Sequence, residues 1–106
     1  MSWIGVDLDG TLAEYHEWRG DDVIGNPIKP MLERVSLWLK AGVAVKIMTA
    51  RPVHPPIKAW CLKYLGVELP VTNSKDFEML ELWDDRAVRV RKNTGEQLSE
   101  SSYGPT

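Results

Sequence analysis

Three short apolar segments, each followed by polar residues, constrain the fold of this 106-residue chain more than any other feature. They cover residues 3–6, 43–48 and 69–72, and longer stretches with helical periodicity lie between them. Short apolar runs that contain β-branched residues and end at turn-forming residues are typical of buried strands. Strands that alternate with helices indicate an α/β domain with a mostly parallel sheet, because parallel neighbours need a crossover between them.

Two amphipathic helices are expected between these strands. Pro30 can occupy the first turn of a helix, and apolar positions then recur until Gly42, which suits a helix end. A second run of apolar residues at helical spacing begins at residue 57 and ends at Gly66.

The rest of the chain divides into a long loop and a C-terminal part. Residues 13–29 form a polar connection, far longer than the roughly 4–6 residues of most connections, and such loops are often functional. We predict a short helical turn over residues 76–80 and one more strand over residues 87–90. The chain is expected to form a single catalytic domain over residues 1–92, followed by a polar tail over residues 93–106.

Composition excludes several classes of protein. Fifteen acidic and thirteen basic residues give a net charge of −2, which rules out binding of nucleic acid through bulk charge alone. The single cysteine, Cys61, excludes an internal disulfide and a cysteine-based zinc site, and a buried thiol suits a reducing compartment. No apolar run approaches the ~18 residues that span a membrane, and no signal peptide is recognisable. We therefore expect a cytoplasmic protein with no membrane partner.

Polar side chains stand at the predicted carboxyl ends of the strands, where α/β sheets bind their ligands. They are Asp7, Asp9, Thr49, Thr72, Lys75, Asp84 and Asp85. Alternation along a strand places Asp7 and Asp9 on the same side. Each residue alone has an ordinary explanation as a turn or a cap, so the inference depends on all of them falling at strand ends in one short chain.

Four carboxylates would share one pocket if Asp84 and Asp85 converge on Asp7 and Asp9. Two like charges 4 Å apart repel by about 4 kcal/mol at an effective dielectric constant of 20. One lysine cannot neutralise four such groups, so either some are protonated or a divalent cation lies among them. Oxygen ligands without a histidine or cysteine cluster favour Mg²⁺ over zinc.

The same residues suit a phosphoryl group. A carboxylate can act as a nucleophile and become an aspartyl-phosphate. Gly10 allows close approach of the backbone and can offer its N–H, Thr49 can donate a hydroxyl hydrogen bond, and Lys75 supplies a positive charge. Oriented donors and cations are the means by which proteins stabilise phosphoryl transfer.

Taken together, these motifs resemble those of a known family. The segment Asp7-Leu8-Asp9-Gly10-Thr11-Leu12, with Thr49, Lys75 and Asp84-Asp85, is similar to the four ordered motifs of the haloacid dehalogenase (HAD) superfamily of phosphotransferases. The resemblance covers about residues 3–90. It implies a Rossmann-like, three-layer α/β/α domain with a mostly parallel sheet, and Mg²⁺-dependent hydrolysis of a phosphate monoester through an aspartyl-phosphate.

The resemblance also implies roles for individual residues. Asp7 would be the nucleophile, and Asp9 would protonate the leaving group and then activate water. Thr49 and Lys75 would hold the phosphoryl oxygens. The metal ligands would be Asp7, the Asp9 backbone carbonyl and Asp84, with Asp85 close by, either beside the ligands without touching the metal or as an alternative ligand.

Two features bear on the substrate. Only residues 13–29 and 52–74 follow the first two motifs, which leaves no room for the cap domain that many family members carry. The sequence also resembles the phosphatase half of phage-type polynucleotide kinases, over residues 9–13 and 24–31, Lys75-Asp76 and Asp84-Asp85-Arg86. This resemblance favours a phosphorylated small molecule, a nucleotide or a nucleic-acid 3′-phosphate as substrate.

Candidate substrate-binding residues lie near the first two motifs: Gly10, Trp18, Arg19, Ala50 and Arg51. Trp18 and Arg19 could stack on a base or hold a second phosphate. Arg51 could either reach the site or pair with an acidic neighbour, and the sequence leaves both open.

Two alternatives to an enzyme belong to other classes. A signalling receiver domain also combines clustered aspartates with a threonine and a lysine, but its phosphorylated aspartate ends a middle strand and its acidic pair ends the first. Here the acidic pair comes last, which argues against a receiver. A phosphate-binding module without turnover would keep the same residues, and the sequence does not separate it from a phosphatase.

Overall fold

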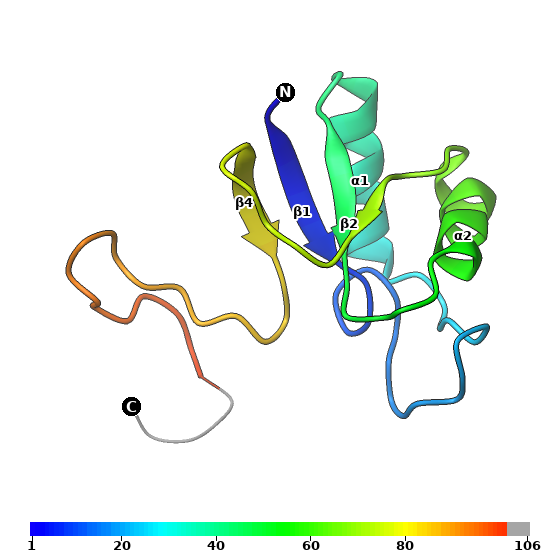
Figure 1. The fold of residues 1–106 in the computed structure, drawn as a ribbon, viewed down its shortest axis with the longest axis horizontal. Coiled ribbons are helices and arrows are strands. Elements are labelled where there is room, and N and C mark those ends of the chain that lie inside the picture. Colours follow the sequence, from blue (N-terminus) through cyan, green and yellow to red (C-terminus); the bar gives the residue numbers. More distant parts are fainter. Residues whose placement is uncertain (102–106) are drawn as a thin grey trace.

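The computed structural model describes residues 1–101 and has an α/β fold (Figure 1). In chain order the elements are β1 (Trp3–Asp7), α1 (Lys29–Lys40), β2 (Val45–Met48), α2 (Pro55–Leu65), β3 (Val71–Thr72) and β4 (Met79–Trp83). The strands form one four-stranded sheet in the order β3-β2-β1-β4, and every neighbouring pair is parallel. The predicted α/β class with a parallel sheet is confirmed.

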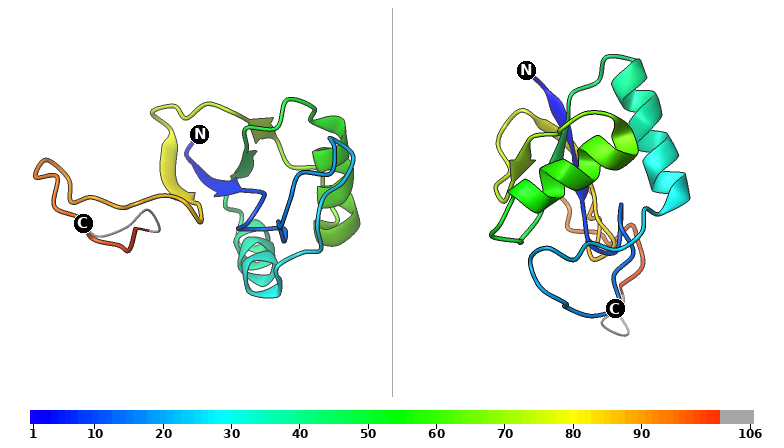
Figure 2. Two further views of the ribbon diagram at one scale, coloured as in Figure 1. Left: turned by 90° about the horizontal axis from the view of Figure 1, so that it is seen from below. Right: turned by 90° about the vertical axis from the view of Figure 1, so that its right-hand side faces the viewer.

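The strand order determines where the connections lie. The chain moves from β1 to β2 to β3 in one direction and then returns to the far side of β1 for β4. Because such crossovers are right-handed, the two halves of the path must use opposite faces of the sheet. In Figure 2, α1 covers one face, α2 lies beside the β3 edge, and the segment 73–78 crosses the other face. An irregular segment therefore takes the place of a helical layer on that face.

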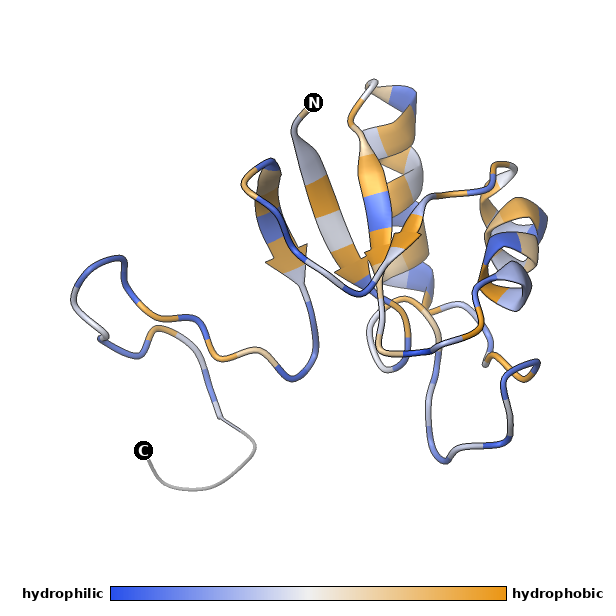
Figure 3. Ribbon diagram, in the orientation of Figure 1, coloured by the Kyte–Doolittle hydropathy of each residue, from blue (hydrophilic) through white to orange (hydrophobic). Residues whose placement is uncertain are grey.

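The core lies between the sheet and the two helices. Ile4 and Val6 of β1 are paired with Val45 and Ile47 of β2, so all four point to the same face. Their side chains form one buried cluster with residues of both helices, Val35 and Ile57 among them. In Figure 3, hydrophobic residues alternate along β1 with residues of intermediate hydropathy, and they flank a hydrophilic residue in β2.

The opposite face is closed by a tryptophan and the crossing segment. Trp3 is 1% exposed, and its indole N–H donates to Asp76 at 2.9 Å. This hydrogen bond lowers the pKa of Asp76. The ammonium of Lys46 lies 4.5 Å from the Trp3 ring centroid. A Cβ at Gly5 would lie 3.1 Å from the Trp3 ring, so the small residue allows the ring to lie flat on the strand.

Two expected elements are wrong. Residues 76–79 form a single turn, in which the Met79 N–H donates to the Asp76 carbonyl at 3.2 Å, but no helical turn extends to residue 80, because β4 begins at Met79 and pairs with the free edge of β1. Residues 87–90 do not form a strand of the sheet, and only Val90 makes an isolated bridge, to Gln97. The segment lies beyond the carboxyl end of β1, where no strand is left to pair with it.

Residues 88–99, which we term the C-terminal arm, project away from the sheet (Figure 1). The arm folds back on itself: the Leu98 N–H donates to the Arg89 carbonyl at 2.7 Å, and the Arg91 N–H donates to the Glu96 carbonyl at 2.8 Å. The predicted polar tail thus contains a hairpin-like turn, while its last part, residues 102–106, lies outside the described residues.

Two further expectations concern Cys61 and the membrane. Cys61 is buried, as expected, and burial raises the pKa of its thiol to about 11, so that the thiol stays protonated at neutral pH. Within residues 1–101, neither helix is long and apolar enough to cross a bilayer.

Candidate active site

Three carboxylates meet where the direction of the chain across the sheet reverses. β1 and β4 are neighbours but are reached by opposite crossovers, which makes the space between their carboxyl ends the expected binding crevice. Asp7 ends β1, and Asp84 and Asp85 directly follow β4. One carboxylate oxygen from each of these three residues lies within 4.8 Å of the other two. We call Asp7, Asp84 and Asp85 the acidic cluster.

A tight turn after β1 gives the cluster its shape. The Leu8 carbonyl accepts hydrogen bonds from the N–H groups of Leu12 and Ala13, at 3.0 and 2.9 Å. Gly10 has a φ of 89°, and a Cβ at this position would lie 2.6 Å from Asp85 Oδ2. Gly10 therefore serves both the turn and the approach of Asp85. Its N–H donates to the Ala13 carbonyl at 2.8 Å, so it is engaged within the turn instead of being offered to a phosphate.

Thr11 links the two strand ends. Its hydroxyl lies 3.3 Å from Asp7 Oδ2 and 3.1 Å from Asp85 Oδ1, and it accepts the Asp85 backbone N–H at 2.9 Å. From the sequence we assigned this threonine no role, although it belongs to the first motif. Its position four residues after Asp7, just past the turn that follows β1, could have indicated that its side chain lies near Asp7.

The Asp84 side chain is held by the turn that follows β4. Its Oδ1 accepts the Arg86 backbone N–H at 2.7 Å. The acidic cluster is therefore organised by main-chain donors and one hydroxyl, without a lysine or arginine side chain bonded to it among the described residues.

The arrangement of the acidic cluster destabilises the ionised form of the Asp7 carboxyl group. Its pKa is raised to about 7, first by burial, then by the hydrogen bond with Asp85 and the negative charges of Asp84 and Asp85, while the Thr11 hydroxyl lowers it. A cation among the three carboxylates would relieve the repulsion. The donors are all carboxylate oxygens, the ligand type that hard divalent cations such as Mg²⁺ prefer.

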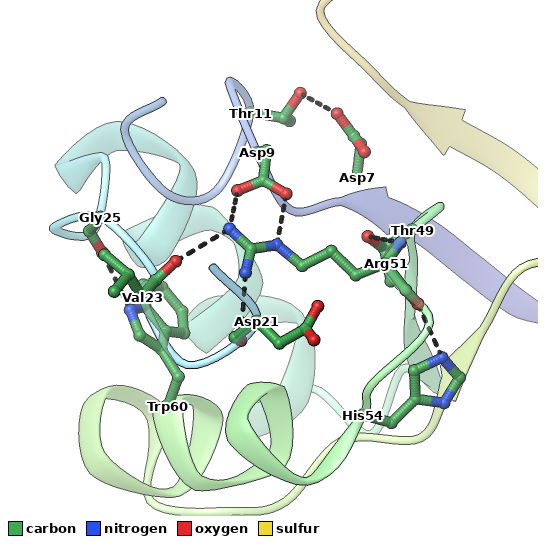
Figure 4. A network of polar contacts seen from close by, with 10 residues as sticks. All are labelled: Asp7, Asp9, Thr11, Asp21, Val23, Gly25, Thr49, Arg51, His54 and Trp60. Carbon is green, nitrogen blue, oxygen red and sulfur yellow. Dashed lines mark hydrogen bonds and ion pairs between the residues drawn. The ribbon is translucent and has the colours of Figure 1, made fainter. Parts of the chain in front are cut away.

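Asp9 takes a different direction from Asp7 and pairs with Arg51 (Figure 4). Arg51 Nε donates to Asp9 Oδ2 at 2.7 Å, and Nη2 donates to Oδ1 at 2.8 Å. The Arg51 side chain is 5% exposed and that of Asp9 is 20% exposed. Of the two possibilities that the sequence left open for Arg51, the structure shows the acidic partner, and the same side chain also borders the cavity described below.

Arg51 also holds the long loop. Its guanidinium donates to the backbone carbonyls of Val23 and Asp21, at 3.0 and 3.3 Å, and lies 4.8 Å from the Trp18 ring centroid. The pKa of Arg51 is raised, mainly by its hydrogen bonds to Asp9.

Residues 14–25 form an Ω-loop, a surface loop whose two ends are pinned close together. The Glu14 N–H donates to the Asn26 carbonyl at 2.8 Å, and the Trp60 indole N–H donates to the Gly25 carbonyl at 3.0 Å. A Cβ at Gly25 would fall 2.0 Å from the Glu14 carbonyl oxygen, so only glycine permits this closure. The predicted functional loop is therefore an ordered element.

A cavity of about 770 Å³ opens over the strand ends. Of the residues predicted from the sequence it brings together Asp7, Asp9, Gly10, Trp18, Thr49, Ala50, Arg51, Asp84 and Asp85. The Thr49 hydroxyl accepts the Arg51 backbone N–H at 3.1 Å and keeps its own hydrogen to donate. Asn73 and Arg86 also line the cavity and were missed as site residues.

Two predicted residues lie elsewhere. Lys75 is exposed in the crossing segment and is not among the residues that line the cavity. Arg19 is exposed, pairs with Glu17 at 3.4 Å, and borders a smaller cavity of about 290 Å³ inside the Ω-loop. The roles expected for both therefore stay predictions.

Comparison with known proteins supports the fold alone. No protein-family model matches the chain, and no curated protein sequence is significantly similar to it. The structure is similar to that of a conserved protein from Bacteroides thetaiotaomicron, with a TM-score of 0.61 and 24% sequence identity. The similarity covers 80% of this chain and 76% of the other, so the two proteins share the parallel α/β architecture.

Proposed function

We propose that this protein is a Mg²⁺-dependent phosphatase of the HAD type, which hydrolyses a phosphate monoester with Asp7 as the nucleophile. The observation that carries the proposal is the meeting of Asp7, Asp84 and Asp85 at the crevice between β1 and β4. The order of the four sequence motifs along the chain supports the same conclusion.

The acidic cluster would hold the cation through one oxygen of each carboxylate, with the Asp9 backbone carbonyl as a further ligand. Bound Mg²⁺ would supply positive charge to the phosphoryl oxygens, over which the negative charge of the transferred group is spread in the transition state. Burial and the neighbouring Asp85 and Asp84 raise the pKa of Asp7, and a cation bound beside it would favour the ionised carboxylate that a nucleophile requires.

The reaction would proceed in two steps. A carboxylate oxygen of Asp7 attacks phosphorus, the ester P–O bond breaks, and the leaving oxygen takes its proton from Asp9. Water then attacks the phosphorus of the aspartyl-phosphate, the bond between phosphorus and the Asp7 oxygen breaks, and inorganic phosphate is released while Asp9 accepts the proton of that water. The Thr49 hydroxyl, which lines the cavity, would donate to a phosphoryl oxygen. Lys75 would have to turn inward from the crossing segment to do the same.

We infer that the substrate is a nucleotide or a nucleic-acid 3′-phosphate presented as a small or terminal group. Trp18 and Tyr15 of the Ω-loop line the cavity and offer rings on which a base can stack. The loop also carries Glu14, Glu17 and Asp22, whose charges would repel a polyanion lying along it.

A second function, phosphate binding without turnover, is favoured by two observations. Asp9 is tied to Arg51 by two hydrogen bonds, and Lys75 does not line the cavity. If Asp9 stays bonded to Arg51 and Lys75 stays outside the cavity when substrate binds, the protein would bind a phosphate ester but protonate the leaving group of that ester poorly.

Turnover distinguishes the two functions. Purified protein is assayed with Mg²⁺ against nucleotides, 3′-phosphorylated oligonucleotides and an aryl phosphate, with and without excess EDTA. We expect hydrolysis that EDTA abolishes, loss of activity in Asp7→Asn, and unchanged activity in Glu68→Gln, which removes an exposed carboxylate outside both the cavity and the Ω-loop. Full activity in EDTA or in Asp7→Asn would contradict the phosphatase. Metal-dependent phosphate binding without hydrolysis would favour the second function.

A further inference from the structure

Charge in the cavity is unevenly distributed between anions and cations. Four carboxylates line it, together with two arginines. Arg86 is exposed, whereas the Arg51 side chain is 5% exposed. A phosphoryl group that enters the cavity brings further negative charge to a place where Arg51 is the buried cation.

The edge of the Arg51 guanidinium that could bind a phosphate, formed by Nε and Nη2, is already bonded to Asp9. Its Nε and Nη2 form two parallel hydrogen bonds with the carboxylate of Asp9, at 2.7 and 2.8 Å. This two-pronged geometry is the one with which arginine binds carboxylates and phosphates alike. One edge of a guanidinium serves one such anion at a time.

We infer that Arg51 exchanges partners, so that a phosphoryl group bound in the cavity takes the guanidinium edge that Asp9 holds. The inference rests on the proposed function, because it assumes that the cavity receives a phosphoryl group. It assigns Arg51 as a phosphate-binding residue and Asp9 as its competitor. Arg51 would thereby determine when Asp9 is available to the substrate.

The exchange also reaches the Ω-loop. The same guanidinium donates to the carbonyls of Asp21 and Val23 and lies against the Trp18 ring. A guanidinium that turns toward a phosphate changes its contacts with all three. Binding at the strand ends is therefore expected to alter the loop that borders the cavity.

A double-mutant cycle in phosphate affinity tests the exchange. Inorganic phosphate is titrated in the presence of Mg²⁺ into wild type, Asp9→Asn, Arg51→Gln and the double variant, by calorimetry. Removing the competitor should strengthen phosphate binding by about 5–10-fold when Arg51 is present, because the guanidinium is released. The same substitution should change affinity by less than about twofold in the Arg51→Gln background, where only a repulsive charge is removed.

Wild-type protein provides a measurement that does not depend on the folding of any variant. The side-chain Nε–H resonance of Arg51 is followed by NMR during the same phosphate titration. We expect it to shift and to saturate with the affinity measured by calorimetry.

Each other outcome is decisive. An equal gain in both backgrounds, or an Arg51 resonance that does not move while phosphate binds, would overturn the exchange but leave the phosphate site and the proposed function in place. Absence of phosphate binding in every form of the protein would overturn both.

Discussion

The raised pKa of Asp7 makes the stability of the protein depend on pH. An aspartate whose pKa is raised in the folded protein binds its proton more tightly there than in the unfolded chain. The folded state is then favoured below the unfolded pKa of about 3.8, and stability is lost as the pH rises toward the folded pKa of about 7. Above that pH the ionised cluster lowers the free energy of unfolding unless a cation compensates it.

This sign gives a prediction about stability in EDTA. Asp7→Asn should raise the free energy of unfolding at pH 8 by about 1–3 kcal/mol, after allowance for partial solvent exposure, and should change it little at pH 4. Urea denaturation at the two pH values measures the difference. The exposed Asp22→Asn serves as control and should show no such dependence. A destabilised Asp7→Asn protein at pH 8 would contradict the electrostatic account.

At Gly10, two effects of a substitution on stability can be separated: the strain of a positive φ and the steric clash of an added Cβ. Gly10→Ala combines an unfavourable φ of 89° with a Cβ that would lie 2.6 Å from Asp85 Oδ2. Gly42→Ala is the matched control, because its φ is 82° and nothing lies within 4 Å of the added Cβ. We expect both to lose about 1 kcal/mol, and Gly10→Ala to lose a further 1–2 kcal/mol or so in urea denaturation.

Only Gly10→Ala should also weaken Mg²⁺ binding, since it displaces a carboxylate of the acidic cluster. Calorimetric titration of both variants with Mg²⁺ tests this. Equal metal affinities in the two variants would show that Gly10 serves the turn alone.

Among the elements, the Ω-loop carries the substrate hypothesis. Trp18 lines the large cavity, whereas Arg19 borders the smaller one and pairs with Glu17. Trp18→Ala should therefore raise KM for a nucleotide by about 5–50-fold, the loss of one stacked base, with little effect on KM for an aryl phosphate. Arg19→Ala should raise KM for the nucleotide by less than Trp18→Ala does, because Arg19 does not line the large cavity. Identical kinetics of Trp18→Ala and wild type on the nucleotide would remove the loop from substrate binding.

The sequence predicted the strand ends well for a physical reason. Residues such as Asp7 and Thr49 follow directly from apolar runs, and in a parallel sheet the carboxyl ends of neighbouring strands meet at one edge. The alternation of apolar residues and the glycine stops are local signals, and they were sufficient for both helices and the first three strands.

Other features depended on tertiary partners that a local pattern does not contain. Residues 79–83 become a strand because the edge of β1 pairs with them, whereas residues 87–90 extend past that edge and stay irregular. The sequence left Arg51 two possible roles, and the structure shows it bonded both to Asp9 and to carbonyls of the Ω-loop, which lie 28 or more residues away in the chain. The position of Lys75 likewise depends on how the crossing segment passes over the sheet.

At the scale of the whole molecule, the C-terminal arm projects from the sheet, and its apolar residues Val88, Val90 and Leu98 are 40–55% exposed (Figure 1). The backbone hydrogen bonds of Arg89, Arg91 and Leu98 are all made within the arm. A chain that ends at residue 87 should therefore keep the sheet, the helices and the acidic cluster, with a Tm within about 5 °C of the full chain. Thermal unfolding followed by circular dichroism measures this. A fall of more than about 10 °C would show that the arm stabilises the domain.

The proposed phosphatase mechanism requires that a phosphoryl group is transferred to the Asp7 carboxylate at the end of β1. The most direct measurement is acid quenching of the protein during turnover with Mg²⁺ and a phosphate ester, followed by mass spectrometry of its peptides. We predict a phosphoryl group on Asp7, absent from Asp7→Asn and from samples without substrate. Steady hydrolysis with no phosphorylated peptide, even when hydrolysis of the aspartyl-phosphate is slowed by Asp9→Asn with an activated aryl phosphate as substrate, or with the phosphoryl group on another residue, would contradict the proposed mechanism.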